Sequence, residues 1–143
     1  MREVNEFLRK FGIKSYDSVI EKVEDSYYVI PENLKSFVKY RPSYIGKKIG
    51  FMRGNNFIPS VDLLFWMSSR SKQKVKLNSE QEWKFICGNN IQRKDLPELK
   101  SEWLLVFNSF NVCIGTAQRT DKYLRRVFDI GDLLRRERKG RRD

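Results

Sequence analysis

Two groups of cationic side chains are spaced so that each could bind a polyanion. In the first, Arg135, Lys139 and Arg142 stand at i, i+4 and i+7, with Arg136 beside them. On a helix this spacing gathers the cations on one side. Guanidinium groups can hold phosphate oxygens with two hydrogen bonds or stack on unpaired bases. We therefore expect an RNA or DNA contact here. The alternative is a solvated basic tail without a partner.

The second group has a cation at every second position: Arg70, Lys72, Lys74 and Lys76. On a strand these four would share one face, while Val75 and Leu77 would point to the other. Two interpretations remain open. The lysines could keep an edge strand from pairing with other chains, or they could contact nucleic acid.

Positive charge is concentrated in the second half of the chain. The 143 residues include 29 basic and 18 acidic ones, a net charge of +11. Residues 1–68 hold 11 basic and 8 acidic residues, whereas residues 69–143 hold 18 and 10. Such a field favours a polyanionic partner. Nucleic acid is the commonest one, and a membrane surface is the weaker competitor.

Catalytic side chains are poorly represented. The sequence has no histidine, the residue best suited to proton transfer near neutral pH, and no Gly-rich phosphate loop. Cys87 and Cys113 lack metal-site spacing and lie in apolar contexts, so we expect two buried free thiols. No apolar run approaches the ~20 residues of a membrane span, and no signal peptide is visible. We expect a soluble intracellular protein without enzyme activity, cofactor or metal.

A hairpin over residues 103–118 should form the core that carries these cations. Residues 103–107 are an apolar run of strand-favouring types, and residues 108–111 supply turn chemistry. Gly115 lies inside the second strand, where glycine marks a bulge or a close approach of two backbones. We take the hairpin as the centre of a small β-barrel, closed by a strand at residues 127–128.

The first half should alternate helices and strands. We expect helices over residues 4–11, from Asp17 to Val23 and from Pro31, and strands over residues 27–30 and 45–53. Ser60 should cap a further helix. The inward positions of the last two helices are predicted to be Leu34, Phe37 and Val38, and then Val61, Leu64 and Phe65.

A polar break at residues 68–71 predicts a boundary between an α/β module, 1–69, and a barrel domain, 70–143. Phe65 and Trp66, beside the break, are either an apolar seam between the two or ordinary core. Asp129 should cap a terminal helix whose apolar arc docks on the barrel and turns the first cationic group outward. That arc consists of Ile130, Leu133 and Leu134.

Several of these segments, in this order, resemble a PUA domain and, more narrowly, the Nip-seven family of ribosome-assembly factors. The resemblance rests on residues 85–91, the hairpin with Gly115, and residues 129–132 leading into Arg135 and Arg136. Upstream, residues 27–29, 45–52 and 60–67 are similar to the family's pre-PUA module. Ala117 departs from the pattern, since many PUA domains have a second glycine there. The chain is also shorter than expected of eukaryotic members, which favours an archaeal-type, cytoplasmic protein; a eukaryotic one would be nucleolar.

The resemblance implies an α+β fold, with an N-terminal pre-PUA-like module followed by a PUA-type β-barrel and a C-terminal helix. It implies a ribosome-biogenesis factor that binds (pre-)rRNA through the barrel and other assembly factors through the first module. The alternative is a protein–protein adaptor with only non-specific RNA affinity. We expect a monomer that binds single-stranded, U- or A/U-rich RNA. The expected RNA-binding residues are Arg135, Arg136, Lys139, Arg142, Lys72, Lys74 and Lys76.

Overall fold

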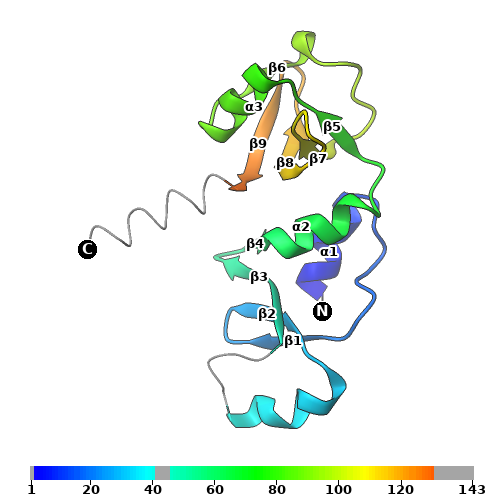
Figure 1. Cartoon of the computed structure of the whole chain (residues 1–143), viewed down its shortest axis with the longest axis vertical. Coiled ribbons are helices and arrows are strands. Elements are labelled where there is room, and N and C mark those ends of the chain that lie inside the picture. Colours follow the sequence, from blue (N-terminus) through cyan, green and yellow to red (C-terminus); the bar gives the residue numbers. More distant parts are fainter. Residues whose placement is uncertain (1, 41–45, 131–143) are drawn as a thin grey trace, which may run out of the picture. The chain divides into compact units, whose positions relative to one another are not determined.

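The computed structural model of the chain describes residues 2–40 and 46–130 (Figure 1). The chain divides into two compact units, Met1–Arg70 and Ser71–Asp143. None of the described helices is long and apolar enough to cross a membrane.

The first unit is built on a four-stranded antiparallel sheet in the order β1-β2-β3-β4. Its strands are β1 (Ile20–Val23), β2 (Ser26–Val29), β3 (Lys47–Arg53) and β4 (Asn56–Pro59). Its helices are α1 (Arg2–Lys10), the 3-10 helix η1 (Glu32–Tyr40) and α2 (Val61–Ser68).

Aromatic rings form the core where α1 meets the sheet. The Phe7 ring lies 5.1 Å from Phe57 and 5.2 Å from Phe11, measured between centroids. Tyr27 meets Phe57 edge-on at 5.7 Å. The predicted first helix is confirmed, since Val4, Phe7 and Leu8 are buried. Gly12, at a φ of 77°, follows the end of the helix.

The helix predicted from Asp17 to Val23 is wrong, because this segment contains strand β1. Glu24 takes a left-handed φ of 56° and reverses the chain, which pairs Ile20 with Val29. The β-branched residues of this segment suit a strand. Its few apolar positions fit the helical period of 3.6 residues as well as the strand period of 2, so the pattern did not decide between them.

The helix predicted from Pro31 is the 3-10 helix η1, and its predicted inner face is not buried. Phe37 is 51% exposed, Leu34 is half-buried, and the side chain of Val38 lies outside the described residues. Leu34 and Phe37, at i and i+3, still share one side of a 3-10 helix, so the predicted side is kept but is not buried.

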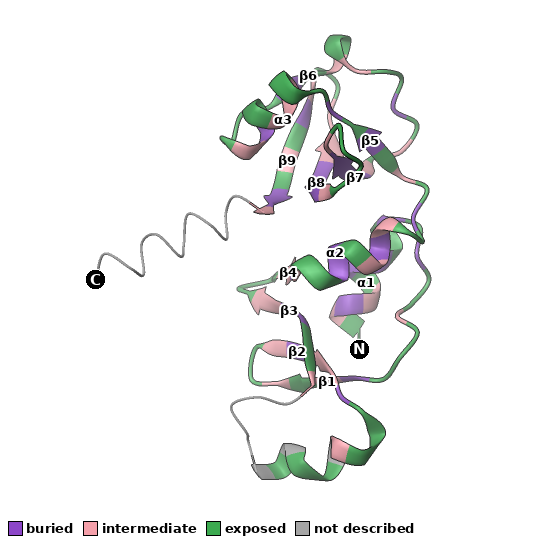
Figure 2. Ribbon diagram, in the orientation of Figure 1, coloured by how far each residue is buried: buried purple, intermediate pink, exposed green. Residues whose placement is uncertain are grey.

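Helix α2 begins as predicted but buries a different face. Ser60 Oγ accepts a hydrogen bond from the Leu63 backbone N–H at 3.1 Å, so the predicted cap is confirmed. The buried residues are Leu63, Leu64 and Met67, whereas Phe65 is 78% exposed and Val61 is also exposed. Figure 2 shows both buried and exposed parts along α2. Residues 61–67 are apolar almost throughout, so their periodicity could not select the inner face.

The second unit is a curled five-stranded sheet in the order β5-β7-β8-β9-β6. Its strands are β5 (Lys74–Lys76), β6 (Ile91–Gln92), β7 (Trp103–Phe107), β8 (Cys113–Arg119) and β9 (Tyr123–Asp129). Its helices are α3 (Ser79–Ile86) and the 3-10 helix η2 (Arg93–Asp95). The predicted hairpin is confirmed as β7 and β8, and the predicted closing strand lies within β9. Among the described residues, β5 and β6 are end strands with one partner each.

Gly115 confirms the predicted close approach of two backbones. A Cβ at this position would lie 2.1 Å from the carbonyl oxygen of Phe128 on the neighbouring strand. The register shifts nearby, between Val106 and Phe107 against β8, and between Thr116 and Ala117 against β9. These irregularities add local twist to the middle of the sheet.

The prediction of two buried thiols is wrong for Cys87, which is exposed, while Cys113 is half-buried. Cys87 directly follows the last residue of α3, where the chain turns away at Gly88. The terminal helix was predicted to begin at Asp129, but beyond Ile130 it lies outside the described residues.

Candidate nucleic-acid interface

The lysine-rich segment forms an end strand of the second sheet, and its alternation is as predicted. β5 pairs with β7 in parallel, with Lys74 opposite Leu105 and Lys76 opposite Phe107. Val75 and Leu77 are buried in the core, whereas Lys74 and Lys76 are exposed. One face of this strand therefore anchors it, and the other presents ammonium groups to solvent.

Arg70 does not belong to this surface, so the prediction that four cations share a face is wrong. Its guanidinium carbon lies 4.2 Å from the centroid of the Trp66 ring, and Nη2 lies 3.3 Å from Asp17 Oδ2. Tyr16 packs on the same indole at 4.4 Å. Buried Ser71 accepts the Gln73 backbone N–H at 3.1 Å, which interrupts the alternation before β5. The Trp66 ring thus packs against side chains of its own unit.

The three lysines differ in what holds them. The ammonium of Lys74 lies 5.3 Å from the centroid of the Phe107 ring, within cation–π range. Lys72 is exposed and precedes the strand. Among the described residues, neither Lys72 nor Lys76 has an ion-pair partner. These side chains can therefore turn toward an incoming anion without breaking an internal ion pair.

Several arginines of this unit instead brace its strands and loops. Arg119 donates to the carbonyl of Leu99 at 2.6 Å, and Arg93 donates to the carbonyl of Thr120 at 3.2 Å. Arg125 donates to the Gln118 side chain. The guanidinium groups of these three arginines are thereby committed to the fold.

Arg126 forms an ion pair with Asp129, whose side chain is almost fully buried at the end of β9. A Cβ on Gly88 would lie 3.3 Å from the same guanidinium group, so the glycine leaves room for it. This bridge lies at the end of β9, directly before Ile130, the last described residue. The first cationic group, Arg135, Arg136, Lys139 and Arg142, lies outside the described residues, so its role stays a prediction.

The turn between β7 and β8 exposes a ring that the sequence did not single out. Phe110 is 82% exposed, the largest value for any large apolar side chain described. The Asn108 side chain accepts the backbone N–H groups of Phe110 and Val112, both at 3.0 Å. A phenylalanine within an Asn-Ser-Phe-Asn turn was the only sequence signal.

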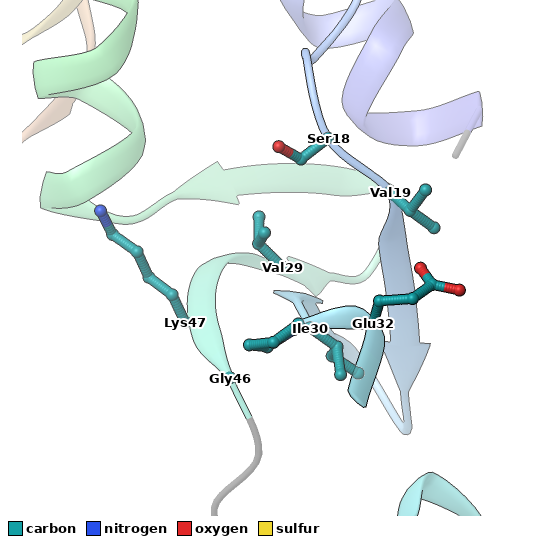
Figure 3. A pocket seen from close by; sticks show the side chains of 8 residues that line it. Ser18, Val19, Val29, Ile30, Glu32, Gly46 and Lys47 are labelled. Atoms are coloured by element: carbon teal, nitrogen blue, oxygen red, sulfur yellow. The ribbon is translucent and has the colours of Figure 1, made fainter. Parts of the chain in front are cut away.

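A pocket of about 650 Å³ lies in the first unit (Figure 3). Val29 and Ile30 lie between Lys47 and Glu32, which stand on opposite sides in this view. Lys47 also approaches Asp62 of α2 at 3.8 Å. The arrangement is an apolar surface with charged margins.

No family model and no curated protein matches the chain. A solved structure, that of a conserved PUA domain protein from Thermoplasma acidophilum, is similar over 95% of this chain and 92% of that one. The TM-score is 0.55 and the sequence identity is 17%. The chain has a PUA-type fold. The lysine strand, the hairpin and the Arg126–Asp129 bridge described above all lie in the second unit.

Proposed function

We propose that the chain is an RNA-binding ribosome-biogenesis factor of the Nip-seven type. Its PUA-type unit would bind (pre-)rRNA, and its first unit would bind other assembly factors. The observation that carries the proposal is the lysine face of β5, open to solvent in the more basic half of a chain with a PUA-type fold. Phosphate contacts by such cations supply most of the non-specific affinity for nucleic acid.

The geometry of β5 suits an extended single strand. Side chains two residues apart on a strand are separated by roughly 6.6 Å. Lys74 and Lys76 can therefore face successive phosphates of one RNA strand, and exposed Lys72 lies just before the strand. A single-stranded, U- or A/U-rich RNA is our proposed ligand, and a monomer our proposed state. The predicted helix with Arg135, Arg136, Lys139 and Arg142 would supply the remaining contacts.

The test is a fluorescence-anisotropy titration of a labelled U-rich oligonucleotide at several salt concentrations. Changing Lys72, Lys74 and Lys76 together to Gln should lower affinity and reduce the slope of log affinity against log salt by ~0.7 for each phosphate that the protein no longer neutralises. A matched control removes the same charge from exposed lysines outside β5: Lys94, Lys100 and Lys122. If the control variant loses as much affinity and slope as the β5 variant, only the overall positive field of the protein attracts RNA. If the salt slope of the β5 variant is unchanged, protection of the sheet edge remains as the role of these lysines.

The second candidate is a protein–protein adaptor in an RNA-processing complex, with only non-specific RNA affinity. The pocket of the first unit, with Val29 and Ile30 between charged margins, favours it. Competition distinguishes the two functions. A protein that binds RNA specifically retains the labelled oligonucleotide when an excess of an unrelated polyanion is added. An adaptor with only non-specific affinity releases it.

A further inference from the structure

We propose that Phe110 is a stacking platform for an unpaired base of the RNA strand whose phosphates lie along β5. This inference rests on the proposed RNA-binding function and adds a base contact to its phosphate contacts. Single exposed apolar side chains are common on protein surfaces and need no explanation by themselves. Two further observations distinguish Phe110, namely the rigidity of its turn and its position relative to the lysines.

The turn is held by five hydrogen bonds that involve Asn108. Its side-chain oxygen accepts the two backbone N–H groups of Phe110 and Val112 noted above. Its backbone N–H donates to the Val112 carbonyl at 3.0 Å, and its carbonyl accepts the Asn111 N–H at 3.1 Å. Its side-chain nitrogen donates to Glu82 on α3 at 3.4 Å. Asn111 adopts a left-handed φ of 62°, which asparagine tolerates. The ring is therefore presented on a pre-ordered backbone, which lowers the entropic cost of binding.

The sheet register brings this turn to the lysine strand. Lys76, the last residue of β5, is opposite Phe107, the last residue of β7. The next backbone N–H, that of Leu77, donates to the Phe107 carbonyl at 2.8 Å. The turn begins at the following residue, and Lys74 lies over the Phe107 ring. The lysine strand and the turn with the exposed ring thus lie at the same end of the sheet. Single-strand binders combine cations with exposed aromatic rings.

The surroundings favour a nucleic-acid base over a protein partner as the occupant. Phe110 is flanked by polar Ser109 and Asn111, and Val112 is the nearest exposed apolar residue along the sequence. The core of a protein interface is normally a larger apolar patch that is depleted of charge. Glu80 and Glu82 place negative charge at the start of α3, so the phosphates should follow the β5 side of the turn. An aromatic ring can stack on any base, so the contact contributes more to affinity than to sequence specificity.

The experiment measures RNA affinity and its salt slope for three full-length variants. Phe110→Ala should weaken binding at least ~5-fold, within the range measured for removal of one stacked base, without changing the salt slope. Phe110→Leu should weaken it as much, because it keeps the apolar surface but not the ring. Phe110→Trp should bind at least as tightly as the parent. The matched control is Phe65→Ala, which removes a ring of similar exposure from the first unit and should change nothing.

The outcomes separate this inference from the function on which it rests. If Phe110→Ala binds like the parent while the lysine variant loses affinity, the stacking platform is wrong and the RNA-binding function stands. If Phe110→Leu binds like the parent, apolar contact suffices and the stacking assignment is wrong. If the parent sediments as a dimer that Phe110→Ala dissociates, a second copy covers the ring and the assignment is also wrong. If the parent does not bind RNA, both proposals fail. Circular dichroism of each variant controls for folding.

Discussion

Gly115 illustrates how a single missing side chain determines the geometry around it. A Cβ there would meet the Phe128 carbonyl oxygen at 2.1 Å and the Asp129 Cα at 2.9 Å, both of which are backbone atoms that cannot rotate away. We predict that Gly115→Ala destabilises the protein by about 1–3 kcal/mol, the usual cost of overpacking. Urea unfolding followed by tryptophan fluorescence measures this. An unchanged midpoint would contradict the close approach.

The two cysteines should differ sharply in reactivity. Burial raises the pKa of the Cys113 thiol to about 11, so roughly one thiol in a thousand is ionised at pH 8. Cys87 is exposed and should react first with iodoacetamide. In a Cys87→Ser variant, labelling of Cys113 should be slow and should speed up as the pH rises toward 11, because the thiolate fraction grows. Intact mass spectrometry measures the rate. Labelling as fast as in urea would contradict this prediction.

At the scale of elements, helix α3 depends on its first residues. Asn78 accepts the Gln81 backbone N–H at 2.8 Å, and the Gln81 side chain accepts the Asn78 N–H at 3.0 Å, a reciprocal capping box. We predict that Asn78→Ala destabilises the protein by about 1 kcal/mol. Thermal unfolding checks this, with exposed Asn90→Ala as a control that should have little effect. An equal melting temperature for parent and Asn78→Ala would show that the cap contributes nothing.

Elements with a local signal could be predicted, and those that depend on distant partners could not. The hairpin of β7 and β8 was predictable because its apolar run, turn and glycine are contiguous. Helix α3 was missed although Asn78 and Gln81 carry a capping signal. The parallel pairing of Lys74 with Leu105 could not be predicted from the sequence, because nothing in a three-residue strand specifies which later strand it pairs with. The solvent exposure of Phe110 follows from the folded turn and not from its residue type.

At the scale of the whole molecule, the two cationic groups should act together if they bind one RNA strand. Changing Arg135, Arg136, Lys139 and Arg142 to Ala should weaken binding at least ~10-fold at moderate salt, about 1.4 kcal/mol. Adding the three lysine substitutions on and beside β5 should lower the salt slope further, by ~0.7 for each further phosphate left without a cation. Anisotropy titration of the two single-group variants and the combined variant measures this. A combined variant with the slope of either single-group variant would show that the groups do not share a strand.

The position of β5 in the sequence has a consequence for synthesis. The strand is translated first within its unit, yet its hydrogen-bond partner β7 is translated only after α3, β6 and η2. Lys74 therefore cannot pair with Leu105 until Leu105 has left the ribosome. Strand β8, the antiparallel partner of β7, is translated directly afterwards. Closing so long a connection is the slow kind of step in folding. We expect the lysine edge to be among the last features assembled, so that an incomplete chain would lack the surface that we propose binds RNA.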